Sequence, residues 1–190
     1  EARGFDWWLA RIHFNLRIFD KVRIDHFRGL ESFWAVPADE KTAINGKWIN
    51  AKGYELFNRL SAQLGNKNII AEDLGVITPE VEKLRDNFGL PGMKVLQFAF
   101  SGDTSNANLP HNFSRNFIVY TGTHDNDTSL GWFTALSKPE RKMLHRYVQG
   151  KGKQFVRNFI EFAWASTACI AIAPMQDILG LDSNSRMNTP

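Results

Sequence analysis

Several features that mark common protein classes are scarce or missing in this sequence. Cys169 is its single cysteine, so no disulfide forms within the chain and we expect a reducing compartment. No stretch approaches the roughly 18 consecutive apolar residues that cross a bilayer. The lysines and arginines form no block of five or six, although the net charge is +3. We therefore expect neither a membrane partner nor a nucleic-acid partner.

The motifs of common cofactor and metal sites are also missing. The chain contains neither a G-x-G-x-x-G turn nor a P-loop, which argues against a dinucleotide-binding sheet. It lacks an H-x-H motif, an H-E-x-x-H motif and a cysteine pair. We expect no cofactor and no metal. A metal site built from His124, Asp125 and Asp127, in a metal-dependent hydrolase, stays open as an alternative.

The composition that remains is that of an ordinary globular protein. The 190 residues are 43% hydrophobic and 23% charged, which suits about one domain with a sizeable core. The sequence starts at Glu1 and not at methionine, so we expect a segment of a longer chain.

Helical periodicity alternates with short apolar runs along the chain. The spacing of apolar residues predicts helices over 5–19, 54–64, 137–150 and 155–163, and one that starts at Thr78-Pro79. We expect strands over 21–25, 68–71, 94–100, 117–121 and 169–173, and a polar loop over 38–53. This alternation predicts parallel strands with right-handed crossovers, as in a doubly wound sheet or a (β/α) barrel.

Acidic residues at the ends of predicted strands favour the barrel. Asp25, Glu72 and Asp125 each follow a strand. The carboxyl ends of barrel strands converge on one mouth, so residues from different strands meet there around one substrate.

Two of these acidic residues have an alternative explanation. Arg23 and Asp25 share one face of a strand, so the guanidinium favours an ionised carboxylate, which a nucleophile requires. The pair could equally brace the sheet. Glu72 follows a wholly apolar strand, where lost solvation favours the protonated form of a general acid. Alternatively, Glu72 or Asp73 caps the following turn.

The stretch from Thr121 to Thr128 is dense in polar side chains directly after an apolar strand. Buried polar groups need partners, and a polyhydroxylated ligand would supply them. Trp34, Trp48 and Trp132 lie in loops or near strand ends, where an indole could stack on a sugar ring or pack beneath a loop. Carboxylates with such a loop fit glycosidic-bond chemistry.

Motifs along nearly the whole chain resemble the 4-α-glucanotransferases, also called amylomaltases or disproportionating enzymes, which are relatives of the α-amylases. In chain order the motifs are VRIDHFRG (22–29), AEDLGVITPEV (71–81), VLQFAF (95–100), LPHNF (109–113), YTGTHDNDTSLGW (120–132) and QDILGLDSNSRMN (176–188). One departure is WINAKG at 48–53, where the family usually has Gly-Pro-Gly after a tryptophan.

The resemblance implies a fold and a set of roles. It implies a (β/α)8 barrel of which residues 1–190 supply about strands 4 to 8, as the C-terminal portion of one catalytic domain whose N-terminal part is absent. Asp25 would be the nucleophile, Glu72 the general acid and base, and Asp125 the third carboxylate. The substrate-binding residues it implies are Arg23, His26, His124 and Asn126.

The implied activity is the transfer of α-1,4-glucan segments between maltooligosaccharides by a retaining double displacement. The expected partners are therefore α-1,4-glucans and maltooligosaccharides, and the expected location is the cytoplasm, or the plastid stroma in a plant. A non-catalytic glycan-binding fragment and an α-amylase-type hydrolase are the alternatives.

Overall fold

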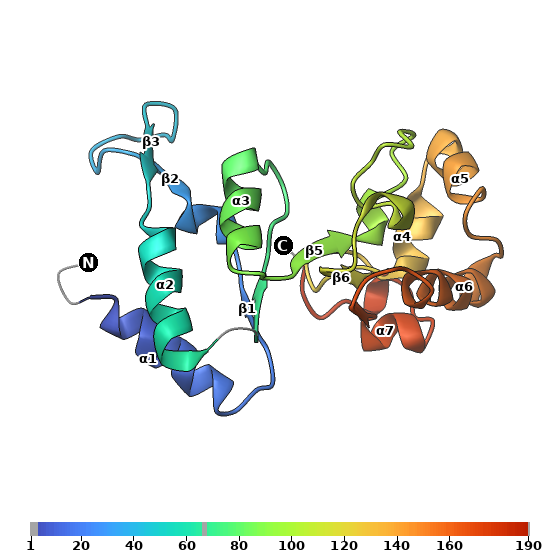
Figure 1. The fold of residues 1–190 in the computed structure, drawn as a ribbon. Coiled ribbons are helices and arrows are strands. Elements are labelled where there is room, and N and C mark those ends of the chain that lie inside the picture. The colour runs from blue at the N-terminus through green and yellow to red at the C-terminus, as the bar shows by residue number, and fades with distance from the viewer. Residues whose placement is uncertain (1–3, 66–67, 190) are drawn as a thin grey trace. The chain divides into compact units, whose positions relative to one another are not determined.

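The computed structural model describes residues 4–65 and 68–189, which fall into two compact units, residues 1–92 and 93–190. Figure 1 colours the elements of the first unit from blue to green and those of the second from green to red. Within the described ranges, no helix is both long and apolar enough to cross a membrane.

Among its described residues, the first unit combines a parallel pair of strands and a β-hairpin with three α-helices. The helices are α1 (Asp6–Leu16), α2 (Gly53–Leu64) and α3 (Pro79–Asn87), and the strands are β1 (Val22–Ile24), β2 (Ser32–Ala35), β3 (Lys47–Asn50) and β4 (Ile69–Ala71). β1 and β4 pair in parallel, with Ile24 opposite Ala71. The core gathers apolar side chains from these helices and strands, among them Leu9, Ile12, Ile24, Phe27, Leu56, Phe57, Leu60, Ile69, Val81 and Leu84.

A β-hairpin in the first unit corrects the sequence prediction. Residues 38–53 are not all loop, because β3 pairs antiparallel with β2 and places Trp48 opposite Trp34. The antiparallel pairing of this hairpin also departs from the expected parallel pairing. All four residues of β3 are exposed, so no apolar alternation marks the strand in the sequence.

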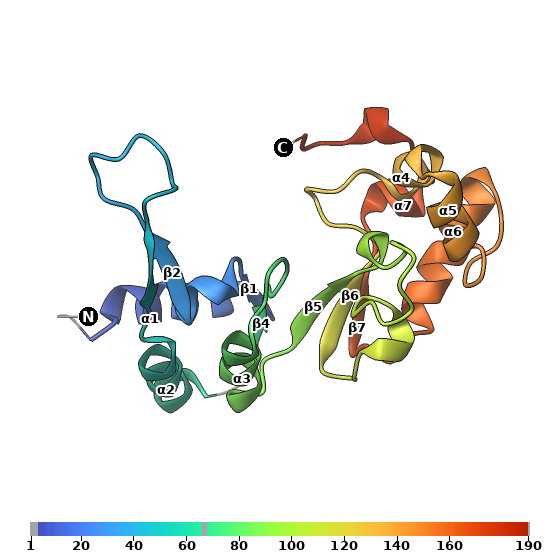
Figure 2. The same cartoon turned by 90° about the horizontal axis from the view of Figure 1, so that it is seen from above.

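The second unit contains a three-stranded sheet and four helices. β5 (Gly92–Val95), β6 (Phe117–Tyr120) and β7 (Ile170–Ile172) lie side by side in that order (Figure 2). β6 and β7 are parallel. The helices are α4 (Ser129–Ala135), α5 (Lys138–Leu144), α6 (Gly152–Trp164) and α7 (Met175–Ile178). α6 has the apolar stripe that the sequence predicts, and it places Phe155, Val156, Phe159, Ile160 and Ala163 in the core.

Several elements differ from their predicted bounds. The strand expected over 94–100 ends at Val95, because Leu96–Phe98 winds into a 3-10 helix. The helix expected over 137–150 ends at Leu144, although its predicted capping box between Ser137 and Glu140 is present. The first helix ends at Leu16 rather than Phe19, and α4 was not predicted at all.

Candidate active site

Asp25 directly follows β1, beside the end of β4. The Nε of Arg23 donates to the Oδ1 of Asp25 at 2.7 Å, so the two side chains share one side of the strand, as strand alternation predicts. The Arg23 side chain is 25% exposed and that of Asp25 is 67% exposed. The site therefore offers a carboxylate that is oriented by a guanidinium and open to an incoming ligand.

Glu72 follows β4 and is held by the main chain that follows β1. Its Oε2 accepts a hydrogen bond from the backbone N–H of His26 at 2.6 Å, and its Oε1 accepts one from the N–H of Leu74 at 3.1 Å. Its own N–H donates to the carbonyl of Ile24 and its carbonyl accepts from the N–H of Phe27, both at 3.0 Å. Glu72 thus lies beside the residues that flank Asp25. The bond from Leu74 also shows that Glu72 caps the following turn, which was the alternative explanation.

His26 contributes to this arrangement through its backbone. Its φ of 52° and ψ of 48° place it in the left-handed region, which costs a non-glycine residue about 1–2 kcal/mol. This conformation accompanies the bond from its N–H to Glu72, while its carbonyl accepts from the N–H of Gly29 at 2.9 Å. No sequence pattern predicted this role, because it belongs to the backbone of His26 and not to its side chain.

The loop after Glu72 is anchored by a buried ion pair that sequence reasoning missed. Arg85 Nη1 of α3 donates to Asp73 Oδ2, and both side chains are at most 7% exposed. Burial by itself would lower the pKa of Arg85, but the hydrogen bonds and charges of Asp73 and Asp86 outweigh it, and the pKa is raised. Asp73 therefore joins the end of β4 to α3 through this ion pair, a role that the sequence did not predict.

Arg28 links three pieces of the first unit. Its Nη1 donates to the carbonyl of Val76 in the loop after Glu72. Its guanidinium carbon lies 4.1 Å from the ring centroid of Trp48 in β3, within cation–π range. Arg28 thus connects the segment after Asp25 with the loop after Glu72 and with the hairpin.

Asp125 lies in the second unit, in the loop between β6 and α4. Its Oδ1 accepts from Asn188 Nδ2 at 2.9 Å and lies 3.5 Å from His124 Nε2. The amide oxygen of Asn126 accepts from both the N–H and the hydroxyl of Thr123 at 2.8 Å. The structure thus brings His124 and Asp125 together, while Asn126 shapes the turn through its oxygen.

Two further carboxylates support this loop, and the sequence prediction assigned neither of them a supporting role. Asp127 accepts from the backbone N–H of Thr128 and from the hydroxyl of Ser183, both at 2.7 Å. Asp177 is buried, at 2% exposure, and accepts hydrogen bonds from Thr121 and Ser129. A polar residue after an apolar strand was the available signal for Asp177, but its partners lie 48 and 56 positions away in the sequence.

The three tryptophans singled out in the sequence differ in their surroundings. Trp34 and Trp48 form an edge-to-face pair on the hairpin with centroids 5.4 Å apart, and they are 40% and 53% exposed. Trp132 instead stacks on Phe159 at 5.3 Å against the second core. Trp132 lies within α4, is partly buried and packs against the core, so it lies neither in a loop nor beneath one.

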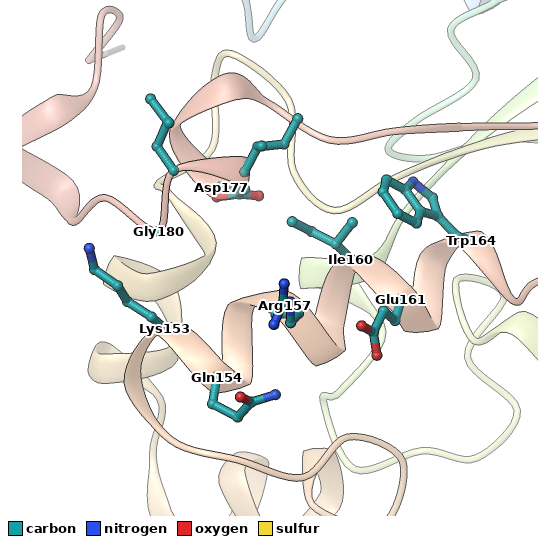
Figure 3. Close-up of a pocket in the computed structure, with 10 residues that line it drawn as sticks. Lys153, Gln154, Arg157, Ile160, Glu161, Trp164, Asp177 and Gly180 are labelled. Atoms are coloured by element: carbon teal, nitrogen blue, oxygen red, sulfur yellow. The ribbon is translucent and has the colours of Figure 1, made fainter.

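The structure contains two cavities whose lining does not include the three predicted carboxylates. A cavity of about 550 Å³ runs between α6 and residues 177–180, and its α6 side carries Lys153, Arg157, Glu161 and Trp164 (Figure 3). A cavity of about 910 Å³ in the first unit is lined by aromatic side chains that include Trp7, Trp8 and Phe33. Neither cavity is lined by Asp25, Glu72 or Asp125.

The candidate metal ligands have other partners. Across residues 4–65 and 68–189, no three histidine, cysteine, aspartate or glutamate side chains gather in a group that could hold a metal ion. Among the residues of the metal alternative, Asp127 bonds Ser183 and Asp125 bonds Asn188.

Comparison with known proteins identifies close relatives. A protein-family model described as 4-alpha-glucanotransferase matches residues 1–190. The 4-alpha-glucanotransferase of Synechocystis sp. is 53% identical over 193 residues, and the chloroplastic/amyloplastic 4-alpha-glucanotransferase of Solanum tuberosum is 51% identical over 191. The Thermus thermophilus 4-alpha-glucanotransferase is 48% identical over 199 residues. Each match includes the whole of this chain but only 38%, 33% and 40% of the respective relative.

A solved structure has the same fold. The amylomaltase from Streptococcus agalactiae in complex with acarbose matches with a TM-score of 0.93 and 36% identity. The match covers all of this chain and 39% of that one. The mixed α/β arrangement described above is therefore one found in an amylomaltase.

Proposed function

Because the chain belongs to the 4-alpha-glucanotransferase family, we propose that it carries the catalytic carboxylates of an enzyme that transfers α-1,4-glucan segments between maltooligosaccharides. The observation that carries this proposal is the 2.6 Å bond from the N–H of His26 to Glu72 Oε2. It places a second carboxyl group next to the residue that follows Asp25. Two carboxyl groups side by side are what a retaining mechanism requires, at a separation of about 5–5.5 Å.

In the first step, Asp25 attacks the anomeric carbon of the donor glucan. The bond from that carbon to the glycosidic oxygen breaks, and protonated Glu72 gives its proton to the leaving oxygen. Arg23 holds Oδ1 of Asp25, and Oδ2 makes no hydrogen bond with any described residue, so Oδ2 is the attacking atom. The product is a glucosyl ester on Asp25.

In the second step, the 4-hydroxyl of another glucan attacks the same carbon. Glu72, now ionised, takes the proton of that hydroxyl, and the ester bond to Asp25 breaks. The two displacements retain the anomeric configuration. Transfer prevails over hydrolysis when an acceptor glucan, rather than water, occupies the site during the lifetime of the ester.

The remaining predicted residues bind the donor sugar. Asp125 accepts hydrogen bonds from sugar hydroxyls and stabilises the positive charge of the oxocarbenium-like transition state. His124 lies beside it, and the imidazole of His26 is available because that residue holds Glu72 only through its backbone. Thr123 fixes the amide oxygen of Asn126, and the amide nitrogen makes no hydrogen bond with any residue that the structure describes, so it can donate to a sugar hydroxyl. Arg23 completes this group through its contact with Asp25.

We also propose that residues 1–190 form the C-terminal portion of a single (β/α)8 barrel and supply about strands 4 to 8. The parallel pairs β1–β4 and β6–β7 support this, as does the short β5–β6–β7 sheet. The chain spans 33–40% of the length of its relatives, which leaves room for further β/α units.

The partners in this proposal are α-1,4-glucans and maltooligosaccharides, in line with the acarbose bound in the S. agalactiae structure. The location of the protein would be the cytoplasm, or the plastid stroma if the protein is from a plant; the S. tuberosum relative is named chloroplastic/amyloplastic.

The test is to incubate the product of the complete gene with maltotriose. Transfer yields glucose together with a ladder of longer maltooligosaccharides. If all products are shorter than maltotriose, the transferase assignment fails and an α-amylase-type hydrolase takes its place. Asp25→Asn should abolish the ladder, whereas Asp39→Asn, which alters an exposed loop acid, should leave it intact. Unchanged activity in Asp25→Asn would reject the assigned nucleophile.

A further inference from the structure

The carboxylate of Asp177 is buried and fully hydrogen-bonded. Asp177 is 2% exposed, and its partners Thr121 and Ser129 are both 0% exposed. Oδ1 accepts from the backbone N–H of Ser129 at 2.7 Å, while Oδ2 accepts from the hydroxyls of Thr121 and Ser129 at 2.7 and 2.6 Å. A buried charge is tolerated when its hydrogen bonds are satisfied in this way, and such charge-assisted bonds are short and strong.

The two partners of Asp177 mark the two ends of the loop that bears Asp125. Thr121 directly follows β6, and Ser129 begins α4, so residues 122–128 form the loop between them. Figure 2 shows α4 and α7 next to each other, as the bonds between Ser129 and Asp177 require. One carboxylate therefore fixes the distance between the two ends of this loop.

The rest of the segment 177–188 touches the middle of the same loop. Ser183 donates to Asp127 Oδ2 at 2.7 Å, Arg186 Nη2 donates to the carbonyl of Asp125 at 3.2 Å, and Asn188 Nδ2 donates to Asp125 Oδ1 at 2.9 Å. The fit is close, because a Cβ at Gly131 would lie 2.1 Å from Ser183 Oγ. The loop is thus held at its ends by Asp177 and along its length by the residues after it.

We infer that Asp177 is a positioning residue for Asp125. This inference rests on the proposed function, in which Asp125 binds the donor sugar, and it adds a residue to which that mechanism assigns no role. Asp177 is buried, and its carboxylate acts through Thr121 and Ser129. Its role is to hold the loop ends so that the Asp125 carboxylate meets the sugar at the geometry of the transition state.

The size of the effect follows from how sharply catalysis depends on geometry. A misplacement of about 1 Å costs about 10²-fold in rate. Removing the Asp177 carboxylate leaves the buried N–H of Ser129 without its acceptor, so the start of α4 has to shift or admit water. Because Asp125 acts on the transition state, kcat should fall by much more than KM rises.

The experiment compares variants of the complete gene product in maltotriose transfer. Asp177→Ala should lower kcat by about 10- to 100-fold. Asp177→Asn should recover most of that loss, because its amide oxygen still accepts from Ser129 N–H and the two hydroxyls can rotate. Glu161→Ala is the control, an exposed acid on α6 that lies outside both the loop and the segment 177–188, and its kcat should stay within about twofold of wild type.

Amide hydrogen exchange provides a readout that does not depend on activity. Peptides covering 122–128 should exchange faster in Asp177→Ala than in wild type, while peptides covering α6 should not change. The inference would be overturned if the loop peptides of a folded Asp177→Ala protein exchanged at the wild-type rate. It would also be overturned if exchange became faster throughout residues 93–190. If the wild-type protein made no ladder, the proposed function would fail, but the exchange result would still decide whether Asp177 positions the loop.

A second pair of variants covers the case in which Asp177→Ala does not fold. Thr121→Val and Ser129→Ala each remove one hydroxyl from Oδ2 and leave the carboxylate in place. Each should give a smaller increase in exchange of the loop peptides and a smaller loss of kcat. Wild-type behaviour of both variants would overturn the inference.

Discussion

The backbone N–H of His26 donates a 2.6 Å hydrogen bond to Oε2 of Glu72. His26 directly follows Asp25, the proposed nucleophile. Its backbone therefore holds the carboxyl group of Glu72, the proposed acid and base. This bond needs the left-handed backbone at His26, where φ is 52°. The local geometry of one residue thus relates the proposed nucleophile to the proposed acid and base.

The first prediction concerns the proton that Glu72 transfers. Glu72→Gln keeps the shape of the side chain but has no acidic proton, so kcat for maltotriose transfer should fall by about 10²- to 10⁴-fold. Glu82→Gln, in an exposed position on α3, is the matched control and should transfer at the wild-type rate. Comparable rates for the two variants would contradict the role given to Glu72.

The second prediction uses the backbone of His26. At this left-handed position glycine should be more stable than alanine by about 1 kcal/mol, because alanine retains the Cβ clash. At His13, an exposed residue inside α1, the order should be reversed by about 0.8–1.0 kcal/mol. Urea unfolding of the four variants measures both differences. The same order at both positions would rule out a left-handed His26.

The third prediction concerns the buried pair of Arg85 and Asp73. Arg85→Met leaves the Asp73 carboxylate buried without this partner and should cost about 3–5 kcal/mol of unfolding free energy. Asp73→Leu added to Arg85→Met should recover a large part of that loss. A double variant no more stable than Arg85→Met would argue against the pair.

The raised pKa of Arg85 gives this pair a definite pH dependence. A group whose pKa is raised by folding contributes its full stabilisation below its unfolded pKa and loses it only as the pH rises through the folded value. For an arginine both values lie far above neutrality. The difference in unfolding free energy between the wild-type protein and the double variant Arg85→Met, Asp73→Leu should therefore be the same at pH 6 and pH 9, and a change above about 1 kcal/mol would contradict this.

The fourth prediction concerns the start of α5. The side chain of Ser137 donates to Glu140, and with the backbone N–H of Ser137 it lowers the pKa of Glu140. Ser137→Ala should cost about 1 kcal/mol at pH 7, whereas Ser114→Ala, in an exposed position, should cost little. Because the pKa of Glu140 is lowered, its contribution is present above the unfolded value and is lost as the pH falls through the folded one. The cost of Ser137→Ala should therefore shrink between pH 5 and pH 3 in thermal unfolding.

The sequence predicts those parts of the site that depend on local spacing. The contact of Arg23 with Asp25 follows from strand alternation alone. The capping box of Ser137 and Glu140 follows from their separation of three residues. Trp132 departs from both of its interpretations, because it lies within α4 and stacks on Phe159 of α6.

The parts that the sequence could not predict depend on distant partners. Nothing in the local sequence distinguishes Asp177 from the other acidic residues. Its partners Thr121 and Ser129 lie 56 and 48 positions away in the sequence. The predicted strand over 94–100 fails for a similar reason. Gln97 leaves the strand in a 3-10 turn and donates its side-chain amide to the carbonyl of Asp127, 30 residues further on, at 2.9 Å.

The pairing of β1 with β4 determines when the turn at His26 becomes ordered during synthesis of the chain. The N–H of His26 and the carboxylate of Glu72 are 46 residues apart, and parallel strands form only after the crossover between them is closed. During synthesis, Asp25 leaves the ribosome well before its partner carboxyl group exists. Until β4 follows, the left-handed turn at His26 lacks the bond that offsets its strain, so this turn should become ordered only after residue 72 has emerged.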